Sequence, residues 1–134
     1  MNLVMDSSAL IALLRGEPGG ELIPPFVDEP SNECYIHAIN LCEVYYGFRR
    51  ETGDQNALRV LEAIRAMPII VREDMDTDFW LSAGCYKADL RRVSLADCFC
   101  MVLANRLDAE LVTADRQEFG PAAEQRLCRV RFVR

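Results

Sequence analysis

The chain has 134 residues, of which 51% are hydrophobic and 27% charged, and its formal net charge is −6 at pH 7. This length and balance are typical of one globular domain, so residues 1–134 are expected to form a single domain. The acidic balance argues against binding nucleic acid through a broad basic face, and no apolar run approaches the roughly 18 residues that span a bilayer.

Short apolar runs alternate with amphipathic stretches in the first half of the chain, which indicates strands alternating with helices. The predicted elements are a strand at 2–6, a helix at 8–14, a short helix or loop at 19–32, a strand at 34–37 and helices at 40–50 and 53–66. Ser7 or Ser8 can cap the first helix. Asn40 can cap the helix at 40–50, with Glu43 three residues later as in a capping box. His37 is expected to have a structural role at the end of its strand.

The second half continues this alternation. Its predicted elements are a strand at 68–72, a helix at 75–90, a largely apolar and therefore central helix at 94–107, a strand at 111–113 and a last strand, at an edge, at 129–133. Phe79, Trp80 and Phe99 are expected in the core. The whole pattern predicts an α/β sandwich with a mainly parallel central sheet flanked by helices.

Six cysteines and a single histidine limit the kinds of metal site that the chain can form. No two cysteines form a C-x-x-C pair, and most lie in apolar runs such as CFCMVL, where a free cysteine behaves as a small hydrophobic residue. A zinc site of cysteine and histidine ligands is therefore poorly supported. Reduced thiols, together with an N-terminus that lacks a basic region before its apolar run, predict a cytoplasmic protein.

Four acidic residues lie where parallel strands end or where helices begin. Asp6 ends the first strand, Asp115 follows the strand at 111–113, and Glu43 and Asp97 lie in first turns of helices. Ligands bind at the carboxyl ends of such strands, so we expect the four to converge there. Unneutralised carboxylates would repel one another, and a divalent cation relieves that repulsion. Oxygen ligands favour Mg²⁺ or Mn²⁺ over zinc.

Each acid also has a purely structural interpretation. Glu43 and Asp97 each lie three residues after a capping residue, Asp115 can terminate a strand in a turn, and Asp6 can sit at a helix N-terminus. The joint pattern, rather than any one acid, indicates a metal site. Two metal ions about 3.5–4 Å apart can hydrolyse a phosphodiester without a histidine base, which agrees with a chain that has one histidine.

The sequence resembles the PIN-domain family at four motifs that occur in the family's order: VMDSSAL, LCEVYYG, LADCFCMVLA and LVTADRQEF. Its length and its E-x-x-x-G form are most similar to VapC-type toxins. The resemblance implies a PIN-like three-layer sandwich that forms one nuclease domain. It implies a Mg²⁺-dependent endoribonuclease, with Mn²⁺ as a substitute, that is the toxin of a type II toxin–antitoxin system. The implied partners are an RNA substrate, a cognate antitoxin and a second copy in a homodimer.

The resemblance also assigns roles to individual residues. Metal binding and catalysis fall on four acids: Asp6, Glu43, Asp97 and Asp115. Supporting polar roles fall on Ser8 and Thr113. Glu118 is interpreted as a secondary acid, a ligand of a metal-bound water or a surface residue. Candidate RNA phosphate contacts, or else solvated surface charges, are Arg91, Arg92 and Arg116.

Two alternatives stay open at this point. Tyr45 and Tyr46 are either part of an ordinary helix face or a contact for a dimer partner or antitoxin. The chain as a whole could instead be a non-catalytic PIN-like module that binds RNA or protein, although all four acids are present.

Overall fold

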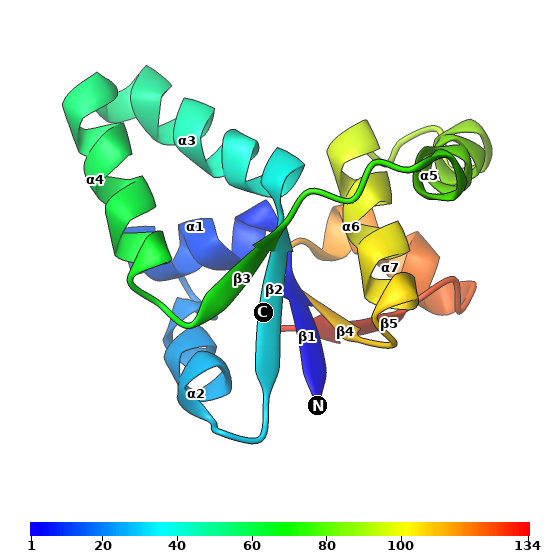
Figure 1. Ribbon diagram of the computed structural model, residues 1–134, viewed down its shortest axis with the longest axis horizontal. Coiled ribbons are helices and arrows are strands. Elements are labelled where there is room, and N and C mark those ends of the chain that lie inside the picture. The colour runs from blue at the N-terminus through cyan, green and yellow to red at the C-terminus, as the bar shows by residue number, and fades with distance from the viewer.

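Five strands form one sheet at the centre of the computed structural model, which describes residues 1–134 (Figure 1). In chain order they are β1 (Asn2–Met5), β2 (Glu33–His37), β3 (Ile69–Arg72), β4 (Glu110–Thr113) and β5 (Arg129–Phe132). Their spatial order is β3-β2-β1-β4-β5, and every neighbouring pair is parallel. The predicted parallel sheet, with an edge strand at the C-terminal end, is therefore confirmed.

Helices cover both faces of this sheet (Figure 1). One face carries α1 (Ser7–Arg15), the short 3-10 helix η1 (Gly20–Leu22), α2 (Ile23–Asp28), α3 (Ala38–Thr52) and α4 (Asp54–Arg65). The other face carries α5 (Thr77–Asp89), α6 (Leu95–Arg106) and α7 (Arg116–Glu124). Successive side chains of a strand point to opposite faces, so Leu3 and Met5 pack in one core and Val4 in the other. The three-layer α/β sandwich is confirmed.

The direction in which the chain builds the sheet changes between β1 and β4. The chain adds β2 and then β3 on one side of β1, crosses over, and adds β4 and β5 on the other side. Val4 is consequently opposite Tyr35 on one side and Leu111 on the other. The backbone N–H of Asp6 donates to the carbonyl of Val112 at 3.1 Å, so the carboxyl ends of β1 and β4 lie together. This is the switch point at which open α/β sheets bind ligands.

Helices α5 and α6 differ in how much of their surface is buried. In α6, all eight residues from Asp97 to Ala104 are buried, which confirms a central helix. In α5, Phe79 and Ala83 are buried one turn apart, and the neighbouring Trp80 is 48% exposed. The expectation that Trp80 lies in the core is wrong because Trp80 points about 100° away from that stripe.

Other differences concern helix ends. α3 begins at Ala38, with His37 rather than Asn40 as its N-cap residue, so Asn40 lies inside the helix. Segment 19–32 forms η1 and α2, whose first turn accommodates Pro24 and Pro25 because the first N–H groups of a helix need no partner. Helix α7 was not predicted, since Pro121 lies inside it.

The six cysteines are all free, as expected, and Cys42 and Cys85 are exposed while the other four are buried. None of the helices combines the length and the apolar character that crossing a bilayer requires.

A candidate acidic metal site

Asp6 is the buried centre of the site, with only 1% of its surface exposed. It follows β1 directly and is the N-cap residue of α1, where its Oδ1 accepts the N–H of Ala9 at 2.9 Å. The Thr113 hydroxyl donates to Oδ2 at 2.7 Å, and the Ser8 hydroxyl lies 2.9 Å from both oxygens. Burial outweighs these hydrogen bonds and, helped by the charge of Asp115, raises the pKa of Asp6 from 3.8 to about 6.

Ser8 and Thr113 are held so that their protons point at Asp6. The Ser8 oxygen accepts the N–H of Ala114 at 3.0 Å, and the Thr113 oxygen accepts the N–H of Asp115 at 3.0 Å. Each hydroxyl is thus occupied as an acceptor and directs its single proton to the carboxylate. These bonds also fix the turn that carries Asp115 against the start of α1.

Asp115 lies two residues after β4 and caps α7, where its Oδ1 accepts the N–H of Glu118 at 2.9 Å. It is therefore a capping residue as well as a member of the acidic site. The same holds for Asp6, so each of the two strands at the switch point ends in a carboxylate that begins the next helix.

Glu43 reaches the site from α3. The predicted capping box with Asn40 is wrong, because α3 begins earlier and Glu43 lies in its second turn. Its Oε1 instead accepts the Ser7 hydroxyl at 3.1 Å, which joins α3 to the first turn of α1. Burial and, to a lesser extent, the charge of Glu118 raise the pKa of Glu43.

Asp97 lies in the first turn of α6, and its N–H donates to the Ser94 hydroxyl oxygen at 3.1 Å, as predicted for a helix capped by Ser94. The residue is 8% exposed. Burial, followed by the charges of Asp6, Glu43 and Glu118, raises the pKa of Asp97 from 3.8 to about 8. The four acids predicted from the sequence are therefore close enough to perturb one another, without a neighbouring lysine or histidine that neutralises them.

Glu118, in the first turn of α7, points inward rather than out from the surface. Its Oε2 atom is buried and has no hydrogen-bond partner, and its charge contributes to the raised pKa values of Glu43 and Asp97. The sequence left three alternatives open for Glu118, since the helix that carries it was not predicted. Asn40 was missed altogether: it is fully buried in α3, and both polar atoms of its amide lack a partner.

The chemistry of these groups fits a hard divalent cation. No three acidic, histidine or cysteine side chains are arranged to enclose an ion as they stand. Mg²⁺ does not require such an enclosure, because it keeps several waters and is commonly held by one or two carboxylates. The donors are all oxygens, the unpartnered Glu118 oxygen is available, and a cation would offset the mutual repulsion that raises the pKa of Asp97.

The three candidate arginines differ in their surroundings. Arg91 and Arg92 are exposed in the turn before α6, where Lys87 donates to the carbonyl of Arg91 at 3.0 Å. The Arg116 guanidinium stacks over the Phe132 ring at 4.5 Å and donates to the carbonyl of Arg134 at 2.7 Å. Arg116 is therefore engaged by the C-terminal segment, whereas Arg91 and Arg92 are open to solvent.

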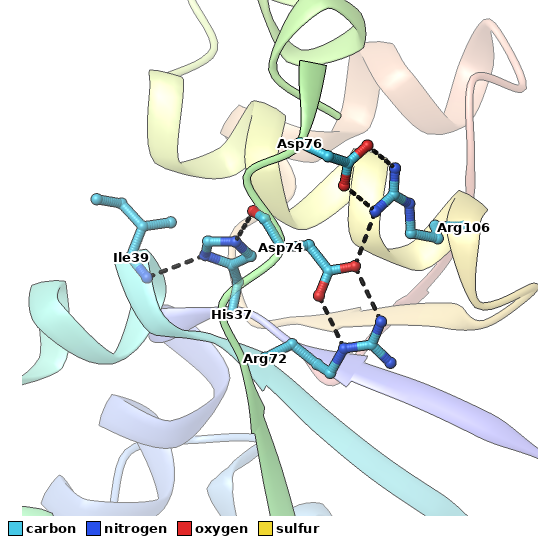
Figure 2. A network of polar contacts seen from close by, with 6 residues as sticks. All are labelled: His37, Ile39, Arg72, Asp74, Asp76 and Arg106. Atoms are coloured by element: carbon cyan, nitrogen blue, oxygen red, sulfur yellow. Dashed lines mark hydrogen bonds and ion pairs between the residues drawn. The ribbon is translucent and has the colours of Figure 1, made fainter. Parts of the chain in front are cut away.

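A second polar cluster, apart from the acidic site, fixes the start of α3 (Figure 2). His37 is buried, and its Nδ1 accepts the N–H of Ile39 at 3.1 Å. Its Nε2 consequently carries the proton and donates to the carbonyl of Asp74 at 2.9 Å. The ring stacks on Phe79 and meets Phe99 edge-on. His37 thus has a structural role, as predicted, but it caps a helix rather than a strand end.

Two aspartates complete this cluster by pairing with arginines (Figure 2). Arg72 donates to Asp74 at 2.8 and 2.9 Å, and Arg106 donates to Asp74 at 3.0 Å and to Asp76 at 2.6 and 2.8 Å. These arginines lower the pKa of both aspartates, that of Asp76 to about 2. The cluster ties the segment after β3 to the end of α6, and so fixes two of the helices that carry site acids.

The structure defines a class of protein: a parallel three-layer sandwich with converging carboxylates at its switch point. The family model of the PIN domain matches residues 3–124. The chain therefore belongs to the PIN-domain family, a family of nucleases, and the resemblance noted from the sequence is confirmed. No curated protein matches the sequence.

Several solved structures share the fold at low sequence identity. A chain of VapBC-1 from nontypeable Haemophilus influenzae is 18% identical, with 99% of this chain and 98% of that chain covered and a TM-score of 0.75. A chain of a toxin–antitoxin complex from Klebsiella pneumoniae is 17% identical, with 98% of each chain covered and a TM-score of 0.70. VapC20 of Mycobacterium tuberculosis, a toxin that cleaves the sarcin–ricin loop, is 16% identical, with 90% and 94% covered and a TM-score of 0.72.

Proposed function

We propose that this PIN-domain protein is a Mg²⁺-dependent endoribonuclease, with Mn²⁺ as a substitute metal, and the toxin of a type II toxin–antitoxin system. The observation that carries this proposal is the convergence of Asp6, Glu43, Asp97 and Asp115 at the switch point without a neutralising side chain. Burial and the neighbouring carboxylates raise the pKa values of Asp6 and Asp97, which supports a cation as the missing partner of the site.

In this proposal Asp6, Asp97 and Asp115 hold the metal, with Glu43 as a further ligand. A bound divalent cation activates water and stabilises the charge that develops on the phosphodiester. Ser8 and Thr113 orient Asp6 through the hydrogen bonds described above, and Ser7 orients Glu43. Glu118, with its unpartnered inward oxygen, accepts a hydrogen bond from a water at the site. Arg91 and Arg92 are available for phosphate contacts because they are exposed.

The biological assignment rests on the fold relatives. The Klebsiella pneumoniae structure is a toxin–antitoxin complex, and VapC20 is a toxin that cleaves the sarcin–ricin loop. We accordingly propose an antitoxin partner, a homodimer and a cytoplasmic location. An acidic pocket of this kind suits an antitoxin segment that carries an arginine or lysine.

The proposal is tested by incubating total cellular RNA with the purified protein in Mg²⁺, in Mn²⁺ and in EDTA. Asp97→Asn is the test variant and Asp76→Asn, from the exposed end of the arginine cluster, is the matched control. We expect discrete fragments only with metal. Because a lost metal ligand removes several kcal/mol of transition-state stabilisation, Asp97→Asn should reduce the rate at least about a hundredfold. Asp76→Asn should stay close to the parent.

Cleavage that persists in EDTA or in Asp97→Asn would contradict the proposal. If no RNA is cleaved, a calorimetric titration with Mn²⁺ distinguishes a nuclease with a narrow RNA target from a non-catalytic module. The non-catalytic module should bind the metal weakly or not at all.

A further inference from the structure

Gly47 occupies a place where the fold gives no reason for a glycine. It lies in the interior of α3, where glycine costs about 1 kcal/mol relative to alanine. The backbone of Gly47 does not adopt the left-handed conformation that favours glycine. A Cβ atom built at Gly47 meets nothing within 4 Å, so no neighbouring element requires the close approach. The glycine instead leaves open space on the surface of α3.

That open space lies on the same face of α3 as a proposed metal ligand. Glu43, Tyr46, Gly47 and Arg50 are spaced i, i+3, i+4 and i+7, so they form one stripe along the helix. The stripe begins at Glu43, in the acidic site, and runs about 10 Å along α3 towards the C-terminal end of the helix. We refer to these four residues as the α3 stripe.

The far end of the α3 stripe carries an aromatic ring and an uncompensated positive charge. Tyr46 is 42% exposed, and the Arg50 guanidinium lies 4.8 Å from the centre of its ring. Arg49 pairs with Asp54 at 3.4 Å, whereas Arg50 forms no ion pair. A hollow of about 400 Å³ adjoins them, lined by Tyr45, Tyr46, Arg49, Arg50, Gly53 and Asp54.

We propose that the α3 stripe is a subsite for single-stranded RNA that flanks the scissile bond. The inference rests on the proposed ribonuclease function and names where its substrate lies. The RNA backbone passes over Gly47, one base stacks on Tyr46 and a phosphate contacts Arg50, which is the combination that single-strand binding sites use. On a chain with net charge −6, an exposed ring beside an arginine without an acidic partner, about two helical turns from the acidic site, suits a polyanion with flat bases.

The sharpest test fills the open space without touching the acids. Gly47→Met is compared with Gly84→Met, a matched control, because Gly84 also lies inside an exposed helix and its Cβ would meet nothing within 4 Å. Both variants are made in the Asp97→Asn background, so that the RNA stays intact. The probe is a short fluorescent single-stranded RNA of random sequence, followed by anisotropy, and thermal unfolding is measured in parallel.

Both substitutions should raise the melting temperature by a few degrees, because each replaces a helix-interior glycine with a good helix former. Gly47→Met should weaken RNA binding about tenfold or more, which is the range expected for the loss of one stacked base, and Gly84→Met should leave it unchanged. Tyr46→Leu should weaken binding similarly, whereas Tyr46→Phe, which keeps the ring, should bind like the background protein.

Equal RNA binding by the Gly47→Met and Gly84→Met proteins would overturn the subsite, as would absence of RNA binding altogether. If Gly47→Met instead blocked only a protein partner, the stripe would belong to that partner and the inference would be wrong. Cleavage by the parent protein is measured separately, so the ribonuclease proposal can stand when the subsite fails.

Discussion

Two clusters of aspartates in this protein are built from similar residues and have opposite electrostatics. In the arginine cluster, Asp74 and Asp76 are each bonded by arginine, and their pKa values are lowered. In the acidic site, Asp6 and Asp97 are surrounded by other carboxylates and by hydroxyls, and their pKa values are raised. The first arrangement stabilises the fold as it stands. The second leaves its carboxylates without a neutralising partner, which is why we interpret it as functional.

The difference should appear most strongly in the pH dependence of metal-free stability. A folded-state pKa raised from 3.8 to about 6 means that folded Asp6 retains a proton that the unfolded chain has lost, so stability falls as pH rises through this window. For the buried Asp6 this corresponds to about 3 kcal/mol, and Asp97 extends the fall towards pH 8. Urea unfolding in EDTA should therefore give lower stability at pH 8 than at pH 5.

Asp6→Asn sharpens this prediction, since asparagine can still cap α1 but has no charge. The variant should lose much of the pH dependence and be more stable than the parent protein at pH 8 in EDTA. The arginine cluster acts in the opposite sense: its lowered pKa values contribute stability that is lost only as pH falls below about 4. A parent protein that gains stability between pH 5 and pH 8 would contradict the comparison.

Removing the partner of the arginines should have the next largest effect. Asp74→Ala removes charge-assisted bonds to Arg72 and Arg106 from a carboxylate whose side chain is 9% exposed. We expect a loss of about 2 kcal/mol of unfolding free energy, measured by urea denaturation at pH 7. Asp78→Ala, an exposed residue of α5 outside the cluster, is the control and should change stability by less than about 0.5 kcal/mol.

A smaller effect should follow from the cap that orients the start of α6. Ser94→Ala removes the acceptor for the Asp97 N–H and should cost about 1 kcal/mol in unfolding free energy. Ser94→Asp keeps an acceptor but adds a charge three residues before Asp97. Its metal-free stability at pH 8 should be lower than that of Ser94→Asn, and a difference of the opposite sign would argue against the repulsion described here.

The alternation of strands and helices, and the ends of the strands at Asp6 and Asp115, could be predicted because hydrophobic periodicity is local. The convergence of the acids also followed from a general rule, since parallel strands bring their carboxyl ends to one edge. The partners of those acids could not be predicted. Glu43 meets Ser7, 36 residues away in sequence, and no local pattern distinguishes that contact from a cap.

Two misses have local causes. Helix α7 was not predicted because it contains Pro121, and proline inside a helix removes one backbone hydrogen bond and usually ends the helix. Without α7, the inward position of Glu118 could not be predicted either. Histidine seldom caps helices, so Asn40 was predicted as the N-cap residue of α3, although the N-cap residue is His37. The structure shows that His37 can cap because its other ring nitrogen is held by the Asp74 carbonyl.

The central claim is that the acidic site is completed by a divalent cation, and the most direct test is the melting temperature at pH 8 with EDTA, with Mg²⁺ and with Mn²⁺. Ligand binding to the folded state alone raises stability, by about 2.7 kcal/mol when the ligand is present at 100 times its Kd. We expect either metal to raise the melting temperature of the parent protein by several degrees, and to have little effect on Asp97→Asn. An unchanged melting temperature in the parent protein, or an equal rise in both proteins, would contradict the account.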